Sequence, residues 1–174
     1  MVLKNTGQNS VQIESSNSVA IVRLKDCVEL SFEDNSISFD KPGEYEHQGI
    51  YIILKEVRET GFVSCANTSR VIADGVRVLF VLDSVDLKQD DLSSLLDIDI
   101  LVVKETNLAK LNNLVKSTDP KKVAIILDTM KVNEITDLIR KTFTNESISS
   151  EKQIKSKEEE FTSENFNVEF ILLK

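Results

Sequence analysis

The sequence predicts a mixed α/β protein with a strand-rich N-terminal half and a C-terminal half in which strands alternate with helices. Short apolar segments separated by Ser, Asn and Asp fill the first half, which is the spacing of an antiparallel meander. After Leu82 the spacing of apolar residues changes from two to about 3.6, the period of a helix. The chain has 174 residues, a length typical of one domain. We therefore expect a single domain over residues 1–174.

The strands expected in the first half are short and are joined by turns with a clear chemical signature. They cover residues 11–13, 19–24, 28–32, 37–39, 50–57, 70–73 and 76–82. Pro42 and Gly43 stand at the second and third positions of a four-residue turn, so we expect a type II turn with Gly43 at positive φ. Asp74 and Gly75 favour a type I′ hairpin, because both central residues of that turn need positive φ.

The second half is expected to contain helices packed on a sheet. The helices cover residues 87–96, 108–115 and 132–143, and the strands cover residues 100–103, 123–127 and 166–172. Strands that alternate with helices imply crossover connections. Residues 144–165 are polar and charged, and they fit either a flexible excursion or a loosely held strand.

Composition disfavours several classes of partner. The formal net charge of −8, without a cluster of Lys and Arg, disfavours nucleic acid. The longest apolar runs have the length of strands, so we expect no membrane span. The first residues do not resemble a signal peptide, and we expect a cytoplasmic protein. Cys27 and Cys65 lack the spacing of metal ligands, and we expect structural thiols in a reducing compartment.

Residues 42–49 read Pro-Gly-Glu-Tyr-Glu-His-Gln-Gly. This string resembles the PGEYE-x-x-G hairpin of a subgroup of small bacterial proteins with the metallo-β-lactamase fold. The resemblance continues through the paired strands at residues 69–81, the aspartate at Asp83 and the helix and strand of residues 87–103, and it covers residues 40–128. It implies a truncated αββα sandwich.

The resemblance also shows what this chain lacks. The family holds one or two metal ions with a His-x-His-x-Asp-His motif, two further histidines and a bridging aspartate. This chain has one histidine, and the segment between Leu24 and Pro42, where the motif is expected, contains none. Leu82 stands in place of a glycine, and Asp128 follows a late strand where a histidine is expected. Only Asp83 remains as a relic ligand, so we expect no catalytic residue, no metal site and no cofactor.

Three other groups of polar residues have a structural interpretation and a functional one. Asp83 fits a turn residue or helix cap, or an acidic cation site together with Asp86, Asp90 and Asp91. His47 fits an exposed strand histidine better than a ligand, because it has no histidine partner. Glu44 and Glu46 share one face of a strand, which favours a solvated surface over an acid/base pair.

Two functions follow from these observations. The first is a pseudo-enzyme that serves as an interaction or scaffolding module and binds an unknown protein or itself through the strand region of residues 24–39. The alternative is a hydrolase with a rebuilt site around Asp83 and Asp128.

Overall fold

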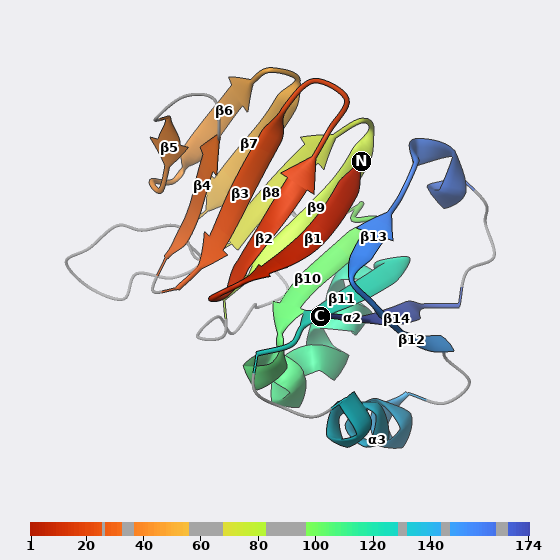
Figure 1. Cartoon of the computed structure of the whole chain (residues 1–174). Helices are drawn as coiled ribbons and strands as arrows, with labels where there is room; N and C mark the ends of the chain where they lie inside the picture. Colours follow the sequence, from red (N-terminus) through yellow and green to blue (C-terminus); the bar gives the residue numbers. More distant parts are fainter. Residues whose placement is uncertain are drawn as a thin grey trace.

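The computed structural model of the chain describes residues 1–25, 27–32, 37–55, 68–82, 97–128, 132–143, 147–162 and 167–174. These residues form two stacked β-sheets with short helices beside the second sheet (Figure 1). The expected α/β architecture is confirmed. The predicted helix at residues 87–96 lies outside the described residues, and so do Asp83 and Cys65.

The first sheet is antiparallel and has the strand order β13-β1-β2-β3-β4-β5. Its strands are β1 Val2–Gly7, β2 Ser10–Glu14, β3 Val19–Leu24, β4 Val28–Phe32, β5 Ser38–Phe39 and β13 Gln153–Lys155. The sequence pattern predicts β3 and β4 with the observed bounds, but it does not predict β1, which carries few apolar residues.

The second sheet is mixed and has the strand order β12-β14-β11-β10-β9-β8-β7-β6. Its strands are β6 Gly43–His47, β7 Ile50–Lys55, β8 Thr68–Ala73, β9 Val76–Val81, β10 Ile100–Lys104, β11 Lys122–Ile126, β12 Ser147–Glu151 and β14 Glu169–Leu173. The strands β6 to β9 pair antiparallel, whereas β9, β10, β11, β14 and β12 pair parallel. The chain therefore changes from hairpins to crossover connections after β9.

The described helices are η1 Glu105–Lys110, α2 Leu111–Thr118, α3 Val132–Thr142 and η2 Glu158–Phe161. The first three connect strands of the second sheet, and η2 connects β13 of the first sheet to β14 of the second. The helix predicted at residues 108–115 begins earlier, as a 3₁₀ turn, and α2 ends at Thr118, followed by Asp119, whose φ of 44° is left-handed. The following Pro120 cannot continue a helix. None of the helices that the structure describes is long and apolar enough to cross a bilayer.

Burial differs between the two sheets and fixes where the core lies. In β3 and β4 every second side chain is buried, so the first sheet packs through one face only. In β10 the first four residues are all buried, which means that both faces of the central parallel strands are covered. The main core therefore lies between the sheets, and the helices cover the outer face of the parallel strands.

The polar segment of residues 144–165 links the two sheets. Within it β12 pairs with β14 in the second sheet, and β13 pairs with β1 in the first. The helix η2 follows, and its Glu160 carboxylate forms a salt bridge of 3.1 Å with the ammonium of Lys122 in β11. The ring of Phe161 lies 5.4 Å from the same ammonium. The segment thus contains two strands, although their residues are more polar than those of the other strands.

A buried carboxylate aligns the starts of three strands. Asp99 is 2% exposed and accepts hydrogen bonds from the backbone N–H, Nε and Nη2 of Arg77, at 2.8, 2.9 and 2.8 Å. Its carbonyl oxygen accepts the backbone N–H groups of Lys121 and Lys122 at 3.1 and 3.0 Å. These bonds hold β9, β10 and β11 in register, and the carboxylate of Asp99 also keeps the pKa of Arg77 above its usual value.

The two turns predicted from the sequence have different outcomes. Asp74 and Gly75 have φ of 49° and 75°, which confirms the type I′ geometry. The type II turn is wrong, because Gly43 does not have positive φ and is the first residue of β6. A Cβ at Gly43 would lie 2.8 Å from the hydroxyl oxygen of Tyr45, so a larger residue at this position would displace the Tyr45 side chain.

Asp74 joins the turn between β8 and β9 to the turn between β2 and β3. Its carboxylate accepts the backbone N–H of Ser16 at 3.1 Å and the Ser16 hydroxyl at 2.7 Å. Burial raises the pKa of Asp74, but the Ser16 hydrogen bonds and the N-terminal ammonium of Met1, 3.0 Å away, together outweigh burial and the pKa is lowered overall.

We expect Asp74→Asn to lower the free energy of unfolding at neutral pH by about 1 kcal/mol or less. Because the folded-state pKa of Asp74 is depressed, its stabilisation is present above the unfolded pKa of roughly 4 and is lost as the pH falls further. Asparagine tolerates the same backbone conformation, so the turn is kept. Urea unfolding of both proteins between pH 7 and pH 3 checks this. A stability difference that stays constant with pH would contradict the assignment.

Candidate metal-site region of the fold

The carboxyl ends of the parallel strands are the expected position of a site, because ligands of α/β proteins bind at that edge of the sheet. In this chain β10 ends at Lys104, β11 at Ile126 and β14 at Leu173. The side chains near these ends decide what chemistry the edge can support.

Asn5 of β1 reaches across from the first sheet to this edge. Its side-chain amide donates to the carbonyl oxygens of Leu127 and Leu173, at 3.2 and 3.1 Å. Its side-chain oxygen accepts the backbone N–H of Gly7 at 2.9 Å. The backbone N–H of Leu127 also donates to Leu173 at 3.1 Å. One amide therefore uses both of its hydrogens to connect the ends of β11 and β14 to the first sheet.

Glu105, directly after β10, is the second polar group at this edge. Its side chain is buried, with 5% of the residue exposed, and its Oε2 accepts the backbone N–H of Asp128 at 3.0 Å. Asp128 itself is exposed. Sequence reasoning does not single out Glu105, although an acidic residue directly after an apolar strand is a signal that could have done so.

The other predicted site residues are spread over the molecule. Asp83, with Asp86, Asp90 and Asp91, lies outside the described residues, so only Asp128 of the pair Asp83 and Asp128 is located. Within the part of the chain that the structure describes, no three His, Cys, Asp or Glu side chains are grouped closely enough to hold a metal ion.

His47 differs from its prediction as an exposed residue. It is half-buried in β6, its ring centroid lies 4.4 Å from that of Phe32, and its Nε2 is buried without a hydrogen-bond partner. The register of β6, β7, β8 and β9 places His47 beside Ile50, and thus level with the start of β9. His47 is therefore at the end of the second sheet opposite to Asp128.

Cys27 also differs from its prediction. It is disulfide-bonded rather than a thiol. The sequence contains one other cysteine, Cys65. A bond between cysteines far apart in the sequence depends on how the strands approach in space, and residue spacing does not reveal it.

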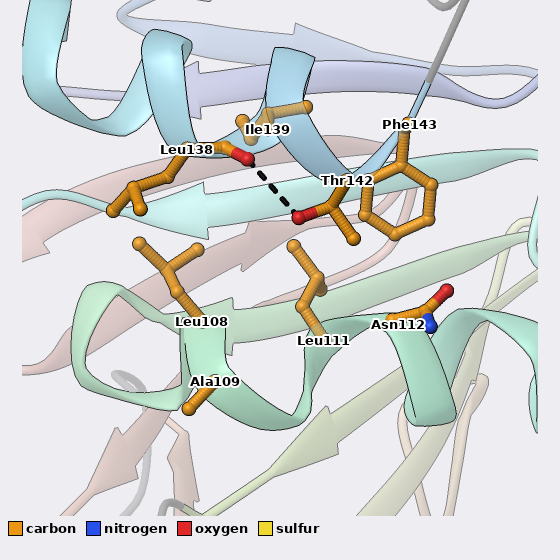
Figure 2. Close-up of a pocket in the computed structure, with 8 residues that line it drawn as sticks. All are labelled: Leu108, Ala109, Leu111, Asn112, Leu138, Ile139, Thr142 and Phe143. Carbon is orange, nitrogen blue, oxygen red and sulfur yellow. Dashed lines mark hydrogen bonds between the residues drawn. The ribbon is translucent and has the colours of Figure 1, made fainter.

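An apolar groove lies between η1 with α2 on one side and α3 on the other (Figure 2). It has a volume of about 360 Å³, and Leu138 at its rim is 43% exposed. The described residues that line it are Leu108, Ala109, Leu111, Asn112, Leu138, Ile139, Thr142 and Phe143. None of these side chains titrates near neutral pH, so the groove offers an apolar surface and no acid or base.

A second cavity, of about 330 Å³, lies beside Arg77, Asp99 and Glu158. Its most buried charges are those of the Arg77 and Asp99 pair, which already hydrogen-bond to each other. These two groups hold strands together and are not available to a ligand.

Comparison with solved structures identifies the architecture. One neighbour is a Thermotoga maritima protein assigned as a Zn-dependent hydrolase of the metallo-β-lactamase superfamily, with a TM-score of 0.69, 12% identity and coverage of 99% of both chains. The chain has a metallo-β-lactamase-like fold. At this identity the similarity shows the fold alone.

A second neighbour of this metallo-β-lactamase-like chain, from Parabacteroides distasonis, is assigned as a metal-dependent hydrolase. It shares 13% identity over 94% of this chain and 98% of its own, but the TM-score of 0.43 is too low to support an argument. No family model matches the sequence, and no curated protein matches it.

The metallo-β-lactamase fold implies one or two metal ions, and the donors located within the described residues do not fit them. The single imidazole, His47, stands on the edge strand β6, five strands from β11. At about 4.8 Å per strand, β6 lies roughly 24 Å from β11, and His47 and Asp128 are also at opposite ends of the sheet. Divalent zinc needs three or four ligands at about 2 Å, so these residues cannot share an ion.

We expect Asn5→Ala to destabilise the fold by about 1–3 kcal/mol, because the carbonyl of Leu127 loses the Asn5 donor and that of Leu173 keeps only the N–H of Leu127. The isosteric Asn5→Asp keeps an acceptor for Gly7 but removes both donors, so it should cost at least as much near neutral pH. Urea unfolding measures both. Wild-type stability in both variants would show that Asn5 does not hold the strand ends together.

Proposed function

We propose that this chain is a non-hydrolytic member of the metallo-β-lactamase fold that works as a protein-interaction module. The observation that carries the proposal is that polar side chains at the strand ends serve the chain's own backbone. Asn5 binds the carbonyl groups of Leu127 and Leu173, and Glu105 binds the N–H of Asp128.

These hydrogen bonds conflict with hydrolysis at the same place. A general base must reach a water molecule or the substrate, whereas Glu105 is buried and occupied by a backbone N–H. Asn5 directs both of its donors at strand ends, so neither is free to stabilise a developing oxyanion. A fold can keep its scaffold while the chemistry of its site changes, because the two are separable.

One observation favours the alternative of a rebuilt hydrolytic site. The buried carboxylate of Glu105 stands next to the exposed Asp128, and carboxylates in different environments are the usual means of separating acid and base roles. A hydrolase built on this pair would need Glu105 to release the N–H of Asp128 during the reaction.

The cytoplasmic location expected from the sequence stays a prediction. The disulfide at Cys27 speaks against it, since disulfides are rare where glutathione keeps thiols reduced.

A panel of ester, phosphodiester and β-lactam substrates, assayed after incubation with zinc, manganese or iron(II), tests the proposal. We expect wild type, Asp128→Asn and Glu105→Gln to give the same background rates, because none holds a complete catalytic set. Turnover by wild type that falls about 100-fold or more in either variant, with the fold intact by circular dichroism, would establish the hydrolase instead.

A further inference from the structure

The strand β6 is the open edge of the second sheet. It pairs with β7 on one side, and no other described strand lies on its other side. The first sheet ends nearby in β5, which has only two residues. Figure 1 shows β5 and β6 together at the same side of the sandwich.

The hairpin register shows which backbone groups of β6 face outward. Gln48 and Gly49 have φ of 47° and 79°, the signature of a two-residue type I′ turn. In such a hairpin the flanking residues His47 and Ile50 exchange hydrogen bonds, and the bonded pairs alternate along the strands. The N–H and C=O groups of Glu44 and Glu46 therefore point away from β7 toward solvent.

The two faces of this edge have different chemistry. On one face Glu44 and Glu46 are exposed, and Glu44 accepts the hydroxyl of Tyr51 at 2.7 Å. On the other face the Tyr45 ring stacks on Phe39, with centroids 4.3 Å apart and planes at 26°.

Further contacts fix this aromatic shelf, which consists of Phe32, Phe39, Tyr45 and His47. The centroids of Phe32 and Phe39 are 6.4 Å apart, and Phe32 packs edge-on against His47. The Tyr45 hydroxyl donates to the carbonyl of Lys41 at 3.0 Å. Phe32 is buried and the other three members of the shelf are half-buried, so the shelf is preorganised and a bound segment would not have to order it.

We propose that β6 captures an extended basic segment of another protein by pairing with it as an additional strand. This inference rests on the proposed interaction function and names its partner class. Backbone groups of the segment pair with Glu44 and Glu46, alternate lysine or arginine side chains face the two carboxylates, and the intervening apolar side chains lie beside the shelf. The net charge of −8 attracts such a segment.

Charge disfavours a second copy of this chain as the occupant. Pairing two β6 strands would bring Glu44 and Glu46 of one copy beside the same carboxylates of the other. Like charges directly opposite each other destabilise a strand pair. The two glutamates therefore protect the edge against self-association while they attract a basic partner.

The test uses a fluorescent heptapeptide of alternating lysine and valine, with fluorescence anisotropy and backbone amide NMR shifts as readouts. The matched variants are Glu46→Pro and Glu46→Ala. Both remove the carboxylate, but only proline removes the outward N–H, and proline is tolerated where that N–H faces solvent on an edge. We expect Glu46→Ala to weaken binding a few-fold and Glu46→Pro to weaken it by at least about tenfold more.

Three controls keep the result decisive. A peptide N-methylated at every backbone amide keeps its charge but cannot donate a backbone hydrogen bond from either edge, and it should not bind. The double substitution Glu44→Lys with Glu46→Lys should abolish binding of the basic peptide while the strand is kept, and this comparison serves if Glu46→Pro does not fold. A glutamate-valine peptide should not bind wild type.

Equal affinity in Glu46→Pro and Glu46→Ala, or binding of the N-methylated peptide, would overturn strand pairing. If the wild type forms a dimer and Glu46→Pro is a monomer, the molecule that pairs with β6 is a second copy of this chain and not a basic peptide. If the peptide does not bind and hydrolase rates stay at background, the β6 site is wrong. The chain would then still be a non-hydrolytic interaction module, but one that uses another surface. Substrate turnover that depends on Glu105 or Asp128 would contradict the proposed non-hydrolytic function, whether or not the peptide binds.

Discussion

The hydrogen bonds of the Asn5 amide are the interaction on which the proposed loss of chemistry depends. The carbonyl groups at the ends of β11 and β14 need donors, because buried backbone acceptors without partners are costly. Asn5 supplies both donors from the other sheet, and Glu105 similarly accepts the N–H of Asp128. At the ends of β10, β11 and β14, these described polar groups are thereby engaged by the chain's own backbone.

The fold could be predicted from the sequence where local patterns decide it. Alternating burial gives β3 and β4 their predicted bounds, and the Asp74–Gly75 turn follows from the φ values that its residues tolerate. β1 could not be predicted, because its residues have little apolar pattern and its position comes from pairing with β2 and β13. Pro42 and Gly43 likewise predict a type II turn, whereas Gly43 begins β6 and packs closely against the Tyr45 side chain, a contact that the local pattern does not reveal.

The candidate site was harder to predict, because its contacts join distant parts of the chain. Asn5 and Leu127 are 122 positions apart, and Asn5 and Leu173 are 168 apart. No spacing rule connects such residues. The sequence does show by its single histidine that the histidine motif of the family is absent. The structure adds that His47 lies at the opposite end of the sheet from Asp128, so the two cannot share a metal ion. Under the proposed strand pairing, the shelf around His47 and the outward backbone groups of β6 would serve a partner protein at that end of the molecule.

Zinc binding at equilibrium tests the central claim most directly, because a metallo-β-lactamase fold without its ligands should not retain the ion. Purified protein would be incubated with excess zinc, dialysed against metal-free buffer and analysed for its elemental content, with Asp128→Asn as the comparison. The account predicts well under one equivalent of zinc in both proteins. A wild-type chain that keeps close to one equivalent, and loses it on substitution of Asp128, would contradict the account and restore a metal centre to this fold.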